Sequence, residues 1–495
     1  MPALSRCFSP LHASRTVRMS FTLPLLLLLA LVMPVRTEAY AVMTHRHLVD
    51  LLWASEITPL LRARFPDTSP DELRNARSFA YGGALIADAG YYPKGEAFTS
   101  DITHYIRSGD FVTNLFRTAT DVYELAFAVG ALTHYVGDAL GHSCATNPSV
   151  ADAFAGVKRT PGSCAYTHLE RNNSARYEDG PAEHRQVEFG FDVNMLNRGR
   201  FMPKKVSDRI GFDVTLQQLT YAFYLTYGLK DDFTEKGFSL NASAYNRASD
   251  ILPAGTDAVA HRNRKLTVQE APTAELDEYN QLLDSAKANG HWREYKQTHG
   301  KMSQTMQILI ALHPTFDIAT IKGPTTITQQ RYLASIVSSV HVLRQILQRM
   351  KEETQLHPAA EPADFLPQWP AGDPLHAVGP LPNFNLDTGE LAGSQPYRLA
   401  NKAYSDLLHK LVENESSDPN WKIPASVSDA LGAHLSTLAQ SATSDNDLAS
   451  LRALHVRQTD GCPRGTFGMR DTGWRDPNPE HRAKTYKPFA SLCDK

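Results

Sequence analysis

The sequence predicts an all-α protein, on two observations. Five segments in the first half of the chain repeat apolar residues at helical spacing, and no alternating strand pattern interrupts them. Glycine and proline residues fall between these segments, where helices end. The five segments are residues 44–65, 70–88, 121–142, 184–197 and 213–228. Composition is that of an ordinary globular protein, since 42% of the 495 residues are hydrophobic and the formal net charge is -3.

The amino terminus predicts export. Two arginines precede an apolar run of 13 residues at 21–33, and the small residues Thr37 and Ala39 suit a cleavage site. The run is shorter than the roughly 20 residues that span a bilayer, and no later segment is long enough. We predict a signal peptide at 1–39, with either Met1 or Met19 as the start, and a secreted or periplasmic mature chain that begins at Tyr40.

The second half of the chain divides into three regions. Residues 261–356 continue the helical pattern, with long helices expected at 276–312 and 324–355. Residues 357–397 contain eight prolines, which exclude one continuous helix and predict a connector. Residues 398–495 are predicted to form a helical C-terminal region, with helices at about 398–414 and 425–440 and an irregular tail.

Removal of the signal peptide leaves four cysteines, an even number that favours disulfides in an exported protein. Pairing by proximity would join Cys144 to Cys164 and Cys462 to Cys493. This is one of three connectivities that four cysteines allow. The alternative is four free thiols. The spacing does not match a thiolate zinc site.

The segment ALTHYVGDALGHS, residues 131–143, is the most informative part of the sequence. It places His134, Asp138 and His142 four residues apart, so that the three side chains share one helix face. Small residues flank them, which leaves room for ions and for neighbouring helices. Without an ion, three buried polar side chains that bond to neighbouring helices would be the alternative.

Other histidines and carboxylates occur at spacings that suit a metal. His184 and Glu188 lie at i and i+4 on a predicted helix, which allows both to bind one ion. The remaining candidates are His45, His47, Asp88 and His104. Each of these, and the His184–Glu188 pair, is by itself more typical of a helix surface or a helix end than of a metal site.

In the order of these residues the chain resembles the zinc-dependent phospholipases C, relatives of the P1/S1 nucleases, over roughly residues 40–230. The matched positions are Tyr40, His45, Asp88, His104, His134, Asp138, His142, His184 and Glu188. The resemblance implies a multi-helix bundle of that family with a helical C-terminal extension, and a catalytic domain at 40–260. The family's usual terminal residue is tryptophan, whereas this chain has Tyr40, which would bind through backbone atoms.

The resemblance also implies a cofactor of three zinc ions. The ligand sets it implies are Asp88, His104, His134 and Asp138 for the first ion, Tyr40, His45 and a bridging Asp138 for the second, and His142, His184 and Glu188 for the third. Asp88 would orient the attacking water or accept its proton. The HxxxDxxxH spacing resembles the glycosylphosphatidylinositol-specific phospholipase D branch, which leaves the headgroup open.

Three functions are compatible with these residues. The first is a secreted zinc-dependent phosphodiesterase, a phospholipase C that touches the membrane surface transiently to reach its phospholipid substrate. The second is a P1/S1-like single-strand nuclease. Two features argue against it: the nucleases have an aspartate where this chain has Glu188, and the sequence lacks a basic stripe for nucleic acid. The third is a non-catalytic helical protein with structural zinc. The ligand set of the third ion has only three protein ligands and leaves one position open, which favours catalysis over a structural role.

Overall fold

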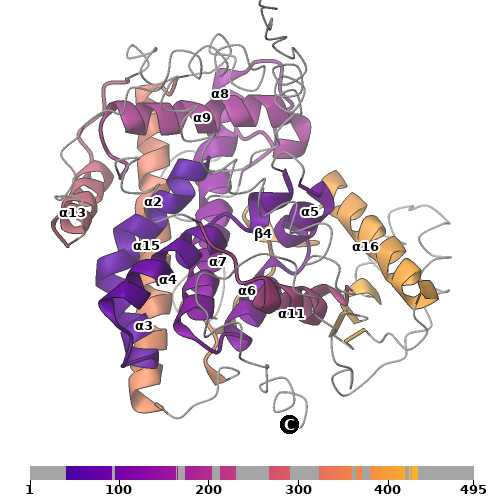
Figure 1. The fold of residues 1–495 in the computed structure, drawn as a ribbon. Coiled ribbons are helices and arrows are strands. Elements are labelled where there is room, and N and C mark those ends of the chain that lie inside the picture. Colours follow the sequence, from indigo (N-terminus) through magenta and orange to yellow (C-terminus); the bar gives the residue numbers. More distant parts are fainter. Residues whose placement is uncertain are drawn as a thin grey trace, which may run out of the picture.

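The computed structural model confirms the all-α fold class (Figure 1). The residues it describes are 41–91, 95–162, 164, 173–202, 212–229, 267–289, 323–358, 364–370, 379–417 and 423–432 without 425 and 428. The predicted signal peptide, Tyr40 and the predicted Cys462–Cys493 pair lie outside these residues. In the described part of the chain, no helix combines the length and the apolar character needed to cross a bilayer.

The predicted helix at 44–65 is divided in the structure. It consists of α2 (Val42–Leu52), the π-helical turn η1 (Trp53–Ile57) and α3 (Thr58–Arg64), which has a proline in its first turn. Buried Asp192 anchors the start of α2, because its carboxylate accepts hydrogen bonds from Met43 N at 3.2 Å and Thr44 Oγ1 at 2.6 Å. The orphan backbone donors at the helix start are thereby partly satisfied.

Helix α4 (Pro70–Gly83) begins at a capping box. The Ser69 hydroxyl accepts from Glu72 N, and the Glu72 carboxylate accepts from Ser69 N. The predicted segment 70–88 extends further than α4, and its last residues belong to a turn and to the 3₁₀ helix η2 (Ala87–Tyr91). Asp88 therefore lies beyond a helix end, as the sequence indicates.

Helix α7 (Val122–Gly141) is the central element of the fold and is buried along its whole length. Asp121 caps it by accepting from Tyr123 N and Glu124 N. Glycines permit a very close approach of α4. A Cβ atom on Gly130 would lie 2.0 Å from Ala80 O, and one on Gly83 would lie 2.0 Å from Phe127 O.

The other helices pack on α7 directly or through intervening helices (Figure 1). They are α5 (Ala97–Tyr105), α6 (Ser108–Arg117), η3 (His142–Thr146), α8 (Asn147–Ala153), η4 (Tyr177–Asp179), α9 (Pro181–Asn197), α11 (Leu216–Tyr227), α13 (Ala274–Asn289), α15 (Thr326–Leu356) and α16 (Arg398–Ser417). The long helix α15 packs along α2, α3 and α7, while α16 packs on α5. One continuous apolar core includes side chains from both halves of the chain.

The proline-rich segment contributes two short antiparallel hairpins. β1 (Gln368–Trp369) pairs with β2 (Gly379–Pro380), and β3 (Phe384–Asn385) pairs with β4 (Glu390–Leu391). The second hairpin lies against α5 and α6, where the Ser108 hydroxyl donates to Phe384 O at 2.6 Å. The described residues of this segment are thus part of the packed fold.

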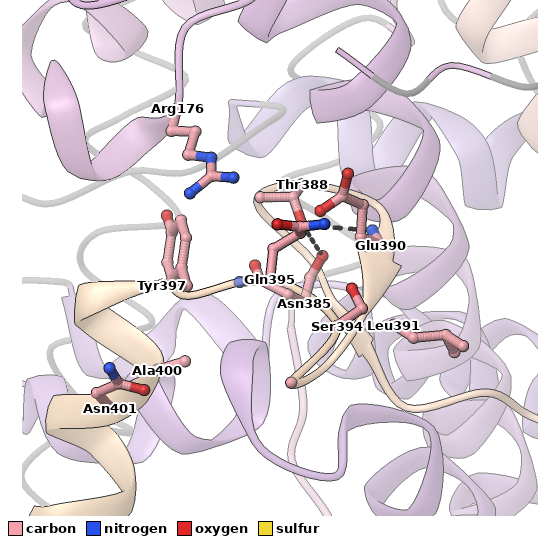
Figure 2. Close-up of a pocket in the computed structure, with 11 residues that line it drawn as sticks. Arg176, Asn385, Thr388, Glu390, Leu391, Ser394, Gln395, Tyr397, Ala400 and Asn401 are labelled. Carbon is pink, nitrogen blue, oxygen red and sulfur yellow. Dashed lines mark hydrogen bonds between the residues drawn. The ribbon is translucent and has the colours of Figure 1, made fainter. Parts of the chain in front are cut away.

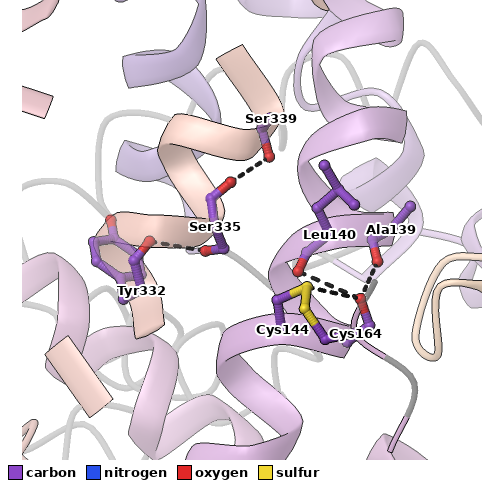
Figure 3. Close-up of a disulfide and its surroundings, with 8 residues drawn as sticks. Ala139, Leu140, Cys144, Cys164, Tyr332, Ser335 and Ser339 are labelled. Atoms are coloured by element: carbon purple, nitrogen blue, oxygen red, sulfur yellow. Dashed lines mark hydrogen bonds between the residues drawn. A yellow bond between two sulfur atoms is a disulfide. The ribbon is translucent and has the colours of Figure 1, made fainter. Parts of the chain in front are cut away.

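The predicted pairing of Cys144 with Cys164 is present (Figure 3). Cys144 belongs to η3, the turn that directly follows α7, and both cysteines are buried. Beside the disulfide, Ser143 Oγ donates to Ala139 O at 2.7 Å. The C-terminal end of α7 is consequently held by a covalent link as well as by hydrogen bonds.

Candidate metal centre

Five of the predicted ligands converge at the centre of the fold. They come from α2, η2, α5 and α7, and none has more than 2% of its surface exposed. They are His45, Asp88, His104, His134 and Asp138. Their arrangement follows from the packing described above, since η2 and α5 both follow α4, which crosses α7 at its glycines.

Asp138 is the residue that joins the cluster. Its Oδ1 lies 3.3 Å from His45 Nε2, while its Oδ2 lies 3.1 Å from His134 Nε2 and 3.4 Å from His104 Nε2. Asp88 flanks the group on the other side, with 3.5 Å between its Oδ1 and His104 Nε2 and 3.8 Å between its Oδ2 and His45 Nε2. Both aspartates thus contact ligands from more than one helix.

These separations suit zinc. Zn–N and Zn–O bonds of about 2.0–2.2 Å place two ligand atoms of a tetrahedral ion roughly 3.3–3.6 Å apart. The atoms of His45, His134 and Asp138 form one compact group, and those of Asp88, His104 and His134 form a second.

Hydrogen bonds at the outer side of two rings strengthen this conclusion. Ser100 O lies 2.8 Å from His104 Nδ1, and Ala84 O lies 2.9 Å from His134 Nδ1. Because carbonyl oxygens only accept, each Nδ1 donates a proton, so that the Nε2 lone pair of each ring, in its neutral form, is directed inward. The two Nε2 atoms are 3.4 Å apart and both face the Asp138 carboxylate. Such a concentration of electron pairs in a buried place fits a cation.

The electrostatics of the cluster differ between its members. Burial, with a contribution from the charge of His134, lowers the pKa of His45 to about 4. Burial alone would raise the pKa of Asp138, but the neighbouring His134 and His45 hold it well below its usual range. Burial alone would lower the pKa of His134, but the charges of Asp138 and Asp88 raise it. Zinc requires an ionised carboxylate and a neutral imidazole, so Asp138 and His45 are ready to bind it, whereas His134 would release a proton when the metal binds.

The remaining predicted ligands form a second buried cluster. The rings of His142, in η3, and His184, in α9, are 6.2 Å apart. Asn147 Oδ1 lies between them, 3.4 Å from His142 Nδ1 and 3.0 Å from His184 Nε2. Burial lowers the pKa of His142 to about 3 and that of His184 to about 4.

Glu188 is the carboxylate of this second cluster and has 1% of its surface exposed. Within the part of the chain that the structure describes, neither of its carboxylate oxygens has a hydrogen-bond partner. Burial, followed by the charges of Asp138 and Asp88, raises its pKa well above the usual value. A buried carboxylate in this situation requires either a proton or a cation.

His47 is separated from the candidate ligands. Its Nε2 is 2.9 Å from the Tyr279 hydroxyl, and its ring packs edge-on against Phe201. The two histidines at the start of α2 therefore have different surroundings: His45 faces the carboxylates, and His47 faces the core. Tyr40, the predicted terminal ligand, lies outside the described residues.

Asp387 is a residue near this cluster that the sequence analysis missed. It is fully buried, and its Oδ1 lies 3.7 Å from His142 Nε2. Its Oδ2 accepts hydrogen bonds from the Tyr105 hydroxyl at 3.0 Å and from the Tyr397 hydroxyl. The only local signal in the sequence is Asp-Thr-Gly, which indicates a turn and no more.

The hairpin that carries Asp387 also borders a surface pocket (Figure 2). Arg176, Thr388, Glu390 and Tyr397 are among the residues that line it, and Thr388 Oγ1 accepts from Glu390 N at 3.3 Å. Tyr397 thus contributes to the pocket wall and also donates its hydroxyl proton to Asp387. The pocket and the buried cluster share this one tyrosine.

Comparison with known proteins gives one match. Residues 44–239 match the family described as zinc dependent phospholipase C. The matched segment includes His45, Glu188 and all the candidate ligands between them, whereas Asp387 lies outside it. No curated protein and no solved structure matches the chain.

Proposed function

Because residues 44–239 belong to the zinc-dependent phospholipase C family, we propose that the protein is a zinc-dependent phosphodiesterase that hydrolyses phospholipid headgroups. The observation that carries the proposal is the buried convergence of three Nε2 atoms on the Asp138 carboxylate, at 3.1–3.4 Å. Two of those rings have their other nitrogen occupied by a backbone carbonyl, as zinc-binding histidines do.

Three ligand sets would hold the ions. Their described members are Asp88, His104, His134 and Asp138 for the first ion, His45 and Asp138 for the second, and His142, His184 and Glu188 for the third. Tyr40 would complete the second set with its terminal amine and carbonyl, provided that the signal peptide is removed before it. Asp138 would bind both the first and the second ion, since its Oδ1 faces His45 and its Oδ2 faces His104 and His134.

The chemistry of hydrolysis needs an attacking water, a base and a leaving oxygen. Bound zinc supplies Lewis acidity for the phosphate and lowers the pKa of bound water toward about 7. Asp88 lies at the edge of the first set, and its Oδ1 has no hydrogen-bond partner within the described residues. It would accept the proton of the water as the new P–O bond forms; when the P–O bond to glycerol breaks, that proton would pass to the glycerol oxygen, which regenerates the carboxylate. The products are diacylglycerol and a phosphorylated headgroup.

The substrate places the enzyme at a membrane surface for each turnover. We propose an exported protein that binds the bilayer transiently. Glu188 supports a lipid rather than a nucleic acid as substrate, because the nucleases of the resemblance have an aspartate at that place.

The proposal is tested by zinc content and by substrate choice. The purified mature protein should contain about three zinc ions per chain, one for each ligand set. It should hydrolyse phosphatidylcholine vesicles or a chromogenic phosphocholine diester, and Asp138→Asn should abolish the reaction. Absence of zinc under metal-replete conditions would refute the proposal. Hydrolysis of single-stranded DNA without lipid hydrolysis would replace it with the nuclease, and bound zinc without either activity would replace it with the structural role.

A further inference from the structure

We infer that Asp387 is a fourth protein ligand for the ion held by His142, His184 and Glu188. This inference rests on the proposed function, since it requires that the centre binds zinc. It concerns a carboxylate that lies 148 residues beyond the end of the family match and belongs to the β3–β4 hairpin.

The orientation of the carboxylate is the first argument. Two tyrosine hydroxyls, from Tyr105 on α5 and Tyr397 just before α16, donate to Oδ2. Oδ1 is directed to His142 Nε2 at 3.7 Å. This distance exceeds a hydrogen bond but is close to the separation of two ligand atoms on one zinc ion, about 3.3–3.6 Å. A carboxylate ligand is typically held in this way, with hydrogen bonds to its outer oxygen.

The backbone of the hairpin fixes Asp387 in this place. Leu386 N donates to His104 O at 3.0 Å, and Asn147 Nδ2 donates to Asp387 O at 2.7 Å. Gly389 has a φ of 68°, and a Cβ at this position would lie 2.4 Å from Ala139 O. The turn therefore needs glycine both for its left-handed backbone and for its close approach to α7.

A second observation concerns Glu188, whose charge interacts with that of Asp387. The Glu188 carboxylate is buried and has no hydrogen-bond partner within the described residues. Asn147 links this place to the hairpin, since its Oδ1 contacts both His142 and His184 while its Nδ2 holds the Asp387 carbonyl. Two buried carboxylates next to two imidazoles form a donor set with the composition of a zinc site.

A fourth protein ligand changes the chemistry of the third ion. Zinc sites closed by four protein ligands are structural, whereas catalytic sites keep a position for water. The third ion would then connect η3, α9 and the hairpin, and the reaction would depend on the other two sets. The sequence alone indicated three ligands and an open position for this ion, because Asp387 was not among the candidates.

The experiment compares zinc binding by the full mature chain and by Asp387→Asn. The substitution should remove about one zinc ion per chain, or weaken the most easily removed ion about 10- to 100-fold in competition with a chelator, and leave the others bound. Asp71→Asn is the control, since the Asp71 side chain is 81% exposed. Equal zinc content and affinity in wild type and Asp387→Asn would overturn the inference.

A second variant covers the case in which Asp387→Asn does not fold. Tyr397→Phe removes one of the two hydroxyl donors and keeps the carboxylate, so it should weaken the same ion by a smaller factor. An unchanged affinity in Tyr397→Phe together with an unfolded Asp387→Asn would overturn a ligand role and leave a purely structural one. If wild type binds no zinc, the proposed function itself fails. If both wild type and Asp387→Asn bind three ions equally, only this inference fails.

Discussion

Gly130→Ala should weaken both the fold and the metal centre. A Cβ at residue 130 would lie 2.0 Å from Ala80 O and 2.8 Å from Ala84 N, whereas ordinary van der Waals contact begins at 3.4 Å. Because both neighbours are backbone atoms, no side-chain rotation relieves the overlap. Helices α4 and α7 must separate by about 1.4 Å at this point, in a core that is packed like a crystal.

The magnitude is the difference between two effects. Alanine is favoured over glycine inside a helix by about 0.8–1.0 kcal/mol, while overpacking of a core costs about 1–3 kcal/mol and more when backbone must move. We expect a net loss of about 1–2 kcal/mol in the free energy of unfolding. The hydrogen bond from His134 Nδ1 to Ala84 O, now 2.9 Å, would also lengthen beyond a hydrogen bond. Loss of such an outer contact typically weakens metal binding about 10- to 100-fold.

Urea unfolding of the zinc-loaded protein and chelator competition measure these two losses. Gly156→Ala is the matched control, since a Cβ there has nothing within 4 Å. Unfolding free energy within about 0.5 kcal/mol of wild type, together with unchanged zinc affinity, would show that the α4–α7 contact does not position the ligands.

Three further predictions use other parts of the fold. Asp138→Asn should lose more zinc than Asp88→Asn by elemental analysis, because Asp138 contacts three histidines; equal losses would contradict its central role. Burial raises the pKa of Asp192 from 3.8 to about 7, so the folded state keeps a proton that the unfolded state releases, and the stability contributed by this carboxyl falls as pH rises between these values. Asparagine does not titrate, so the unfolding free energy of Asp192→Asn relative to that of wild type should rise by on the order of 4 kcal/mol between pH 4 and pH 8; a difference independent of pH would exclude this titration. Replacement of both Cys144 and Cys164 by serine should cost about 3 kcal/mol in urea unfolding, the loop-closure value for a separation of 20 residues; a loss below about 1 kcal/mol would show that the link does not constrain the unfolded chain.

The sequence predicts those elements whose signals are local. The segment predicted from residue 70 begins at the capping box of Ser69 and Glu72, and the four-residue steps from His134 to His142 place three candidate ligands along α7 and the turn η3 that follows it. The pairing of Cys144 with Cys164 follows from their proximity in sequence. In each case the determining interaction lies within a few turns or one loop.

Features that depend on distant contacts could not be predicted. Helix α5, with the sequence AFTSDITHY, lacks an amphipathic pattern because nearly all of its residues are buried by other elements. Asp387 becomes part of the site only through hydrogen bonds from Tyr105 and Tyr397 and through the packing of Gly389 on α7. Nothing in the residues next to Asp387 distinguishes it from any other turn aspartate.

The contacts of the β3–β4 hairpin can form only late in the synthesis of the protein. Tyr105 and Asp387 are 282 residues apart, and ribosomes add roughly 5–20 residues per second. Between about 15 and 55 s therefore separate the synthesis of these two partners. From the synthesis of Glu188 onward, the nascent chain has all the described members of the three ligand sets but not the hairpin whose Asp387 lies beside His142. Such distant pairing also slows folding of the released chain, since the closure of a long loop must precede the contacts that stabilise it.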